Sequence, residues 1–162
     1  MNSAPQAAKS TFVYVTYIRT TPERLWQALT DAEFTRQYWL KAKMNAEWKV
    51  GGTWTMSFPD GSVADTGEVV EFDPPRRLAL RWRNEFKPEL KAEGWSLCTM
   101  VLEPAGGGSV KLTVTHSMER ADSKFIGAVA GGWPLILSNL KSLIETGSIV
   151  VPGEISRERH GG

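Results

Sequence analysis

The sequence predicts an α+β fold: a curved antiparallel β-sheet wrapped around a long C-terminal α-helix, with two short helices after the first strand. Three observations predict it. Short runs of alternating apolar and polar residues fill the middle of the chain, which is typical of strands with one buried face. Two helix-start signals follow the first strand-like run, and apolar residues recur at helical spacing near the end. A sheet with one apolar face needs a cover, and the final helix is the only long cover that the sequence offers.

The first strand and the two short helices are marked by composition and by start signals. Residues 12–18 (FVYVTYI) are mostly β-branched or aromatic, which favours a strand. At residues 20–23 (TTPE) a threonine cap precedes a proline in the first helical turn, and the glutamate suits the positive end of a helix. Residues 30–33 (TDAE) have the form of a capping box and start a second short helix. The apolar side of these helices comprises Leu25, Trp26, Leu29, Phe34, Tyr38 and Trp39.

The later strands are separated by turn residues. Gly51-Gly52 is a two-residue hairpin signal, and the prolines at positions 74 and 75 forbid a continuing ladder. We expect strands at residues 47–50, 53–58, 67–72, 78–83, 95–103 and 110–116. Alternation along these strands predicts that the following side chains face the final helix: Trp54, Met56, Leu80, Trp82, Met100, Leu112 and Val114.

The last element is an amphipathic helix. We expect it at residues 130–146, with a start anywhere from 123 to 132, because Gly131-Gly132 and Pro134 should kink it or begin a new segment. Gly147 stands where a left-handed C-terminal cap is expected. The apolar stripe comprises Phe125, Val129, Trp133, Ile136, Leu137, Leu140, Leu143 and Ile144.

These elements make one domain, at residues 11–147. Residues 1–10 are small and polar, and residues 148–162 end in charges and glycines, so we expect a disordered N-terminal tail and a C-terminal tail. His160 lies in the second tail and is given no role.

Composition excludes several classes of protein. The net charge is +1 and no basic stripe is present, so we expect no binding to nucleic acid. No run approaches the roughly 20 apolar residues of a transmembrane helix, and the start has no apolar core of a secretion signal, so we expect no membrane insertion. The single cysteine, Cys98, fits a reducing compartment, and the sequence predicts a cytoplasmic protein.

Several motifs, in order, resemble one known family. The resemblance is to bacterial proteins similar to the activator of the heat-shock protein 90 ATPase, within the START-like, polyketide-cyclase-like (SRPBCC) superfamily of helix-grip folds, and it covers roughly residues 11–147. The motifs are residues 18–33 (IRTTPERLWQALTDAE), 50–54 (VGGTW), 67–78 (GEVVEFDPPRRL) and 110–116 (VKLTVTH), then Gly132-Trp133 with Leu137, Leu140, Lys141 and Leu143.

The resemblance implies a helix-grip fold and leaves three functions open, because the superfamily hosts several. The leading hypothesis is a binding module for a hydrophobic or aromatic small molecule, held between the sheet and the final helix. On this hypothesis the protein is not an enzyme. One alternative is an aromatase/cyclase- or hydrolase-like enzyme that uses the same cavity. The other is a co-chaperone-like interaction module, although named eukaryotic activators contact the chaperone through an additional N-terminal domain and only ten residues precede the first strand here. The oligomeric state, monomer or dimer, stays open.

Bulky residues on the predicted inner faces are the candidate lining of a ligand cavity. Each tryptophan or methionine taken singly is explained by core packing, but as a set they suit a wide apolar site. The predicted ligand-binding residues are Tyr38, Trp39, Trp54, Met56, Trp82, Met100, His116 and Trp133.

His116 is the polar candidate within this set. It ends an apolar strand face, so one prediction is that a backbone carbonyl or water at the cavity rim satisfies its hydrogen bonds. Alternatively, it donates a hydrogen bond to a ligand, or it acts with Tyr38 as an acid or base in a reaction. No motif for nucleophilic catalysis is present, and Cys98 is expected to behave as a small buried hydrophobe. Two histidines, one of them in a tail, cannot supply a metal site, and no cofactor motif occurs.

Overall fold

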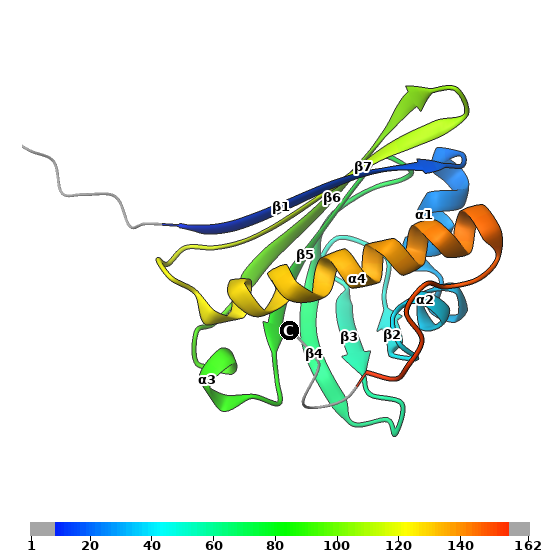
Figure 1. Ribbon diagram of the computed structural model, residues 1–162. Coiled ribbons are helices and arrows are strands. Elements are labelled where there is room, and N and C mark those ends of the chain that lie inside the picture. Colours follow the sequence, from blue (N-terminus) through cyan, green and yellow to red (C-terminus); the bar gives the residue numbers. More distant parts are fainter. Residues whose placement is uncertain (1–8, 156–162) are drawn as a thin grey trace, which may run out of the picture.

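Seven antiparallel strands form one curved sheet in the computed structural model, which describes residues 9–155 (Figure 1). The order across the sheet is β1-β7-β6-β5-β4-β3-β2, so the first strand lies beside the last and the remaining neighbours follow the chain. The strands are β1 (Ser10–Arg19), β2 (Lys43–Ala46), β3 (Thr53–Ser57), β4 (Val63–Asp73), β5 (Arg77–Asn84), β6 (Ser96–Gly106) and β7 (Ser109–Met118). The helices are α1 (Pro22–Thr30), α2 (Ala32–Tyr38), α3 (Pro88–Lys91) and α4 (Lys124–Thr146).

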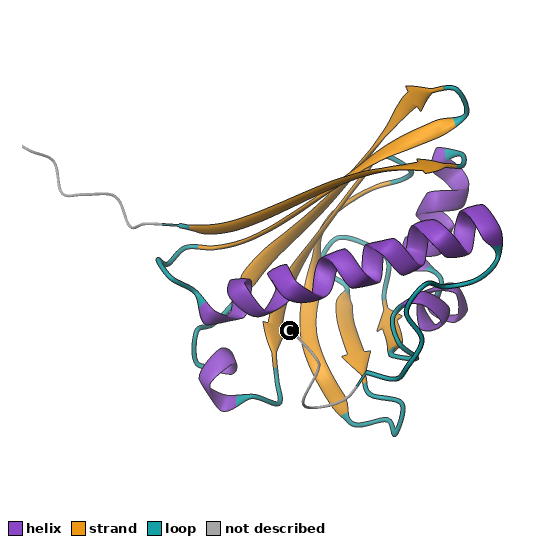
Figure 2. Ribbon diagram, in the orientation of Figure 1, coloured by secondary structure: helices purple, strands orange, loops and turns teal. Residues whose placement is uncertain are grey.

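The predicted fold class is confirmed. α4 crosses one face of the sheet, and α1 and α2 lie beside its C-terminal half (Figures 1 and 2). α1 begins at the expected cap, where the Thr21 hydroxyl accepts from the Arg24 amide (3.2 Å). The cap of α2 is Asp31, whose carboxylate accepts from the Phe34 amide (2.9 Å), and not Thr30, the first residue of the predicted capping box, which ends α1. Two short capped helices therefore connect β1, at one edge of the sheet, to β2, at the opposite edge.

One predicted strand is wrong. Residues 47–50 form a loop, and the strand that pairs with β3 is β2, four residues earlier in the chain. Gly51-Gly52 therefore closes a longer connection that runs from Glu47 to Gly52, rather than a two-residue hairpin. Glycine is required at position 52, since a Cβ there would lie 1.9 Å from the Glu47 carbonyl oxygen.

α4 is one continuous helix of 23 residues, although the sequence predicts a kink or a new start near Pro134. The Ser123 hydroxyl caps it by accepting from the Ile126 amide (3.1 Å), and Gly147 ends it with φ 86°. An internal proline costs about 3 kcal/mol. The long buried stripe offsets that cost: Phe125, Ile126, Val129, Trp133, Ile136, Leu137 and Leu140.

The core lies between the concave face of the sheet and the helices. The seven side chains predicted to face the final helix are all buried, which confirms the alternation in β3, β5, β6 and β7. α4 shares the cover over them with α1 and α2, so they do not all face the final helix. Burial of this apolar set is the main stabilising contribution in such a layer arrangement.

Part of the segment expected to be a tail packs onto the domain. Asn139 of α4 is fully buried, and its side chain accepts from the Val150 and Val151 amides (2.9 and 2.8 Å) and donates to the Val151 carbonyl (2.9 Å). The Ile155 side chain is buried, and its amide donates to the Leu40 carbonyl (2.7 Å). Asn139 thus holds Val150 and Val151 against α4, and Ile155 is held separately at Leu40, just after α2. The expectations for residues 1–8 and 156–162, His160 included, lie outside the described residues.

Candidate functional site

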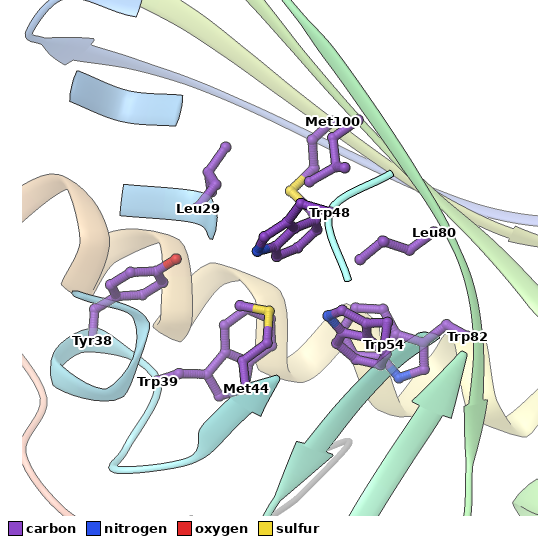
Figure 3. Close-up of a pocket in the computed structure, with 10 residues that line it drawn as sticks. Leu29, Tyr38, Trp39, Met44, Trp48, Trp54, Leu80, Trp82 and Met100 are labelled. Atoms are coloured by element: carbon purple, nitrogen blue, oxygen red, sulfur yellow. The ribbon is translucent and has the colours of Figure 1, made fainter. Parts of the chain in front are cut away.

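An enclosed apolar cavity lies between the β2–β6 side of the sheet and the two short helices (Figure 3). Its volume is about 10 Å³, which just accommodates one water molecule. None of its lining side chains is charged, and none comes from α4. They are Leu29, Tyr38, Trp39, Met44, Trp48, Trp54, Leu78, Leu80, Trp82 and Met100.

Five of the eight predicted site residues line this cavity: Tyr38, Trp39, Trp54, Trp82 and Met100. The other three are buried but are not part of its wall: Met56, His116 and Trp133. Sequence reasoning missed Trp48 because residues 47–50 were assigned to a strand, and missed Met44 because no strand was expected there. Leu29, Leu78 and Leu80 were placed in the core without being assigned to the cavity.

A glycine brings two of the wall tryptophans together. Trp54 pairs with Gly67 across β3–β4, and Gly67 pairs with Trp82 across β4–β5, so the three residues form one row. A Cβ on Gly67 would lie 1.7 Å from the Arg81 carbonyl oxygen and 3.4 Å from the Trp54 ring. The absent side chain lets the indoles approach to 4.4 Å between ring centroids, at 48°.

Both of these indoles carry a buried N–H group with no hydrogen-bond partner among the described residues. Trp54 and Trp82 are 1% and 3% exposed, so neither Nε1 reaches bulk solvent. An indole N–H only donates, and leaving such a donor unpaired inside a protein is costly. Two residues of the cavity wall therefore carry buried donors for which residues 9–155 supply no partner.

The other polar groups of the wall are satisfied by backbone carbonyls. The Tyr38 hydroxyl donates to the Ala28 carbonyl (2.9 Å), and burial raises the pKa of this phenol. The Trp48 indole donates to the Thr30 carbonyl (2.9 Å). The Tyr38 hydroxyl is thus neutral, and its proton is used in a structural hydrogen bond to the backbone.

The helix-side edge of the cavity is formed by two half-buried tryptophans, Trp39 and Trp48. Trp39 is the C-cap residue of α2, and the next two residues, Leu40 and Lys41, have φ 50° and 64°. Non-glycine residues in this left-handed region cost about 1–3 kcal/mol and occur where the chain holds a special geometry. The backbone that carries Trp39 is therefore strained next to the cavity.

Packed aromatic rings lie between the sheet and α4, on the side where the sequence predicts the cavity. The Trp133 ring of α4 lies 5.1 Å from Trp39 and 5.9 Å from Trp82, both edge to face. His116 lies 5.1 Å from Trp82 and 5.3 Å from Phe125. This aromatic layer separates the described cavity from α4.

His116 lies at the centre of a complete hydrogen-bond network. Its Nδ1 accepts from the Trp133 indole N–H (3.1 Å), so the ring proton resides on Nε2. Nε2 donates to the Ser96 hydroxyl (2.8 Å), and that hydroxyl donates to the Trp82 carbonyl (2.7 Å). Every polar atom in the chain of contacts has a partner.

This network fixes His116 as a neutral imidazole. The side chain is fully buried, and burial lowers the pKa of His116 to about 3. Protonation would place a second N–H against the Trp133 N–H, where two donors would meet. In this geometry the histidine orients Trp133 and Trp82; it has no free nitrogen for a substrate proton.

Comparison of the sequence with models of known protein families identifies the family of this chain. The profile described as Activator of Hsp90 ATPase homolog 1-like protein matches residues 19–145, which is most of the chain. The chain belongs to this family. The resemblance stated from the motifs is thereby confirmed. No curated protein sequence matches the chain.

Solved structures of similar proteins share the fold of this Hsp90-ATPase-activator-like chain. Protein MLL2253 from Mesorhizobium loti is 26% identical, with a TM-score of 0.73 over 86% of this chain and 100% of that one. PFC0360w, an HSP90 activator from Plasmodium falciparum, is 22% identical, with a TM-score of 0.68 over 85% and 96%. The Aha1 dimer from Colwellia psychrerythraea is 19% identical, with a TM-score of 0.69 over 85% and 98%.

The rest of this family member offers little reactive chemistry within residues 9–155. Cys98 is buried, and burial raises the pKa of its thiol, so the sulfur stays protonated. No group of three metal-binding side chains gathers anywhere in that range. None of the helices described there is long and apolar enough to cross a membrane.

Proposed function

We propose that this chain binds a flat, mainly apolar small molecule in the cavity between α1, α2 and the β2–β6 side of the sheet. One observation carries the proposal: four tryptophans and two methionines converge there from six separate segments, and none of the wall is charged. Flat aromatic walls and flexible thioethers are typical of apolar ligand sites.

The ligand enters by displacing the edge of the cavity. Sites for small organic molecules have volumes of about 300–1,000 Å³, far above the closed volume in this structure. The half-buried side chains of Trp39 and Trp48 are the movable part of the wall, and the strained residues after Trp39 favour movement there. Met44 and Met100 adapt their shape behind them.

Binding is tested with N-phenyl-1-naphthylamine, a neutral apolar dye whose emission rises when it leaves water. Titration of the dye with wild-type protein should raise its emission. Trp39→Ala removes part of the wall and should tighten binding, because less displacement is needed. Trp95→Ala is the matched control, since Trp95 is 43% exposed and is not part of the wall.

The outcomes separate the cavity from the outer surface. No emission rise with wild type or with Trp39→Ala contradicts the proposal. Loss of binding in Trp95→Ala, with Trp39→Ala unchanged, places the dye on the outer surface and contradicts it as well. Native mass spectrometry of the purified protein shows whether a small molecule accompanies it.

The enzyme alternative finds no support in the geometry of His116 and Tyr38. Both nitrogens of His116 are engaged, and the Tyr38 hydroxyl is bound to a backbone carbonyl. A general acid or base needs a free position within hydrogen-bond reach of its substrate.

We also propose, as a second candidate, protein binding through the convex face of the sheet. The side chains of Val13, Val15 and Tyr17 on β1 are 55%, 45% and 52% exposed, and Leu97 on β6 is 42% exposed. Pairing through β7 places these residues on one outer surface, and the family is described by activation of a chaperone ATPase. Exposed apolar surface of this kind favours a protein partner.

The second candidate is tested by the ATPase rate of a bacterial Hsp90-type chaperone. Wild-type protein should raise that rate, and Val13→Lys should abolish the rise, because the lysine charge would face an apolar contact. Trp39→Ala, on the opposite side of the sheet, should retain the stimulation. An unchanged ATPase rate with wild-type protein contradicts this candidate.

A further inference from the structure

The segment after α4 is fastened to the edge of the cavity that a ligand has to displace. Residues 148–155, which we call the strap, turn back from the end of α4 and pass beside α2 (Figure 1). The Ile155 amide of the strap donates to the Leu40 carbonyl (2.7 Å), and the Ile155 side chain is buried. Leu40 directly follows Trp39, a half-buried residue of the cavity wall. The strap therefore holds the backbone next to the movable part of the wall.

Asn139 of α4 ties the strap to the same edge. Its amide side chain is fully buried among the apolar residues of the helix, where polar atoms are costly unless they are paired. Its Oδ1 accepts from the Val150 and Val151 amides of the strap. Its Nδ2 donates to the Val151 carbonyl (2.9 Å) and to the carbonyl of Tyr38, the last residue of α2 (3.4 Å). One buried side chain thus joins the strap, α4 and a residue of the cavity wall.

The chain between these two attachment points has an unfavourable backbone conformation. Leu40 and Lys41 both have positive φ, which residues other than glycine adopt only where surrounding contacts impose it. The strap supplies two such contacts: the hydrogen bond to the Leu40 carbonyl, and an ion pair between Lys41 and Glu154 (3.8 Å). Release of the strap removes both contacts, so the backbone after Trp39 is then free to relax.

We propose that the strap is a latch that controls access to the cavity. When docked, it holds Trp39 in the wall and keeps the site closed, and when released, it lets the edge move and admits the ligand. This inference rests on the proposed function and names the regulation of the same site. Because the ligand binds only the released form, the apparent affinity is reduced by the fraction of molecules in which the strap is released. Weaker docking of the strap should therefore strengthen ligand binding.

Replacing Ile155 by serine tests the latch. The substitution removes a buried aliphatic side chain from the strap and leaves every residue of the cavity wall in place. Stopped-flow mixing and equilibrium titration with N-phenyl-1-naphthylamine should show about 10-fold faster and tighter binding by Ile155→Ser, because loss of the buried side chain shifts the strap towards release. Val150→Ser is the matched control: the Val150 side chain lies in the same segment but is 61% exposed, so this variant should bind like wild type.

Hydrogen exchange reports whether the strap is released. The amides of Val150, Val151 and Ile155 should exchange faster in Ile155→Ser than in wild type, and faster in wild type with the dye than without it. A variant with faster exchange but wild-type rate and affinity for the dye overturns the latch and leaves ligand binding in the cavity standing. Unchanged exchange in wild type saturated with the dye overturns the latch as well. Absence of dye binding in wild type and in both variants overturns the inference together with the proposed function.

Discussion

Replacing His116 by glutamine is expected to flatten the dependence of stability on pH. His116 is neutral in the folded protein, because burial lowers its pKa to about 3, whereas an exposed histidine in the unfolded chain has a pKa of about 6.5. Below about pH 6.5 the unfolded chain therefore takes up a proton that the folded protein refuses. Acid shifts the equilibrium towards unfolding, so the contribution of His116 is present above its ordinary pKa and is lost as the pH falls towards 3.

The magnitude follows from these two pKa values. Between about pH 7 and pH 5 the free energy of unfolding should fall by about 2 kcal/mol through His116 alone. Further acidification should remove about 1.4 kcal/mol per pH unit until the native pKa is approached. Glutamine does not titrate, and its amide carries both an acceptor and a donor for the Trp133 and Ser96 partners.

The assay is urea unfolding followed by tryptophan fluorescence at several pH values between about 7 and 5, for wild type and His116→Gln. His160 is present in both proteins, so its titration cancels in the comparison. The stability difference between the two proteins should narrow by about 2 kcal/mol as the pH falls. Parallel curves would refute the reasoning: they would mean that His116 binds protons equally in both states and is free to serve as an acid or base.

Three further predictions concern the framework around the cavity. Leu140→Ala should lower the free energy of unfolding by about 2–5 kcal/mol, because the side chain is fully buried in α4, whereas Ser138→Ala on the exposed side of the helix should change it little; equal urea midpoints would contradict the assigned helix face. Gly67→Ala should cost at least about 1–3 kcal/mol, because its Cβ would meet a carbonyl oxygen of the neighbouring strand, while Gly127→Ala, which meets nothing, should gain about 0.5–1 kcal/mol; thermal melts that rank the two in the opposite order would contradict this. Asn139→Ala should cost about 1–3 kcal/mol and speed amide hydrogen exchange in the segment after α4; unchanged exchange would show that other contacts hold that segment.

The sheet could be predicted from the sequence because each long strand carries its own alternation. In β7, Val110, Leu112 and Val114 alternate with polar residues, and this period of two places them inward whatever the neighbouring strands do. The start of α4 could not be placed to the residue, because Pro134 indicates a break. The break is absent because burial on both sides of the proline holds one helix together.

The β2–β3 connection shows why local signals fail at the cavity edge. Two adjacent glycines are a hairpin signal, but the short segment KMNA of β2 has no pattern that identifies it as a strand. Its pairing with β3 places Met44 and the following Trp48 at the cavity, a consequence of tertiary contacts and not of propensity. The sequence pattern therefore predicts a strand at residues 47–50 instead of at β2.

The cavity depends on register, which couples residues far apart in the sequence. Trp54 and Trp82 meet only because both pair with positions at Gly67, from opposite sides of β4. Gly67 begins the predicted strand at residues 67–72 and one of the motifs that carry the family resemblance, whereas in the structure it lies inside β4, where a glycine marks close approach. Read together with the inward tryptophans of the two flanking strands, that glycine was the available clue to the site.

The two faces of the sheet separate the two candidate functions by a physical rule. Along β6, Cys98, Met100 and Leu102 point inward, whereas Leu97 points outward and is 42% exposed. A substitution on one face therefore leaves the side chains of the other face in place, unless it unfolds the domain. For this reason Trp39→Ala and Val13→Lys are expected to act independently: the first should change only ligand binding and the second only protein binding. If either variant altered both readouts while remaining folded, the ligand and the partner would be coupled through the sheet, and the cavity would serve to control the interaction.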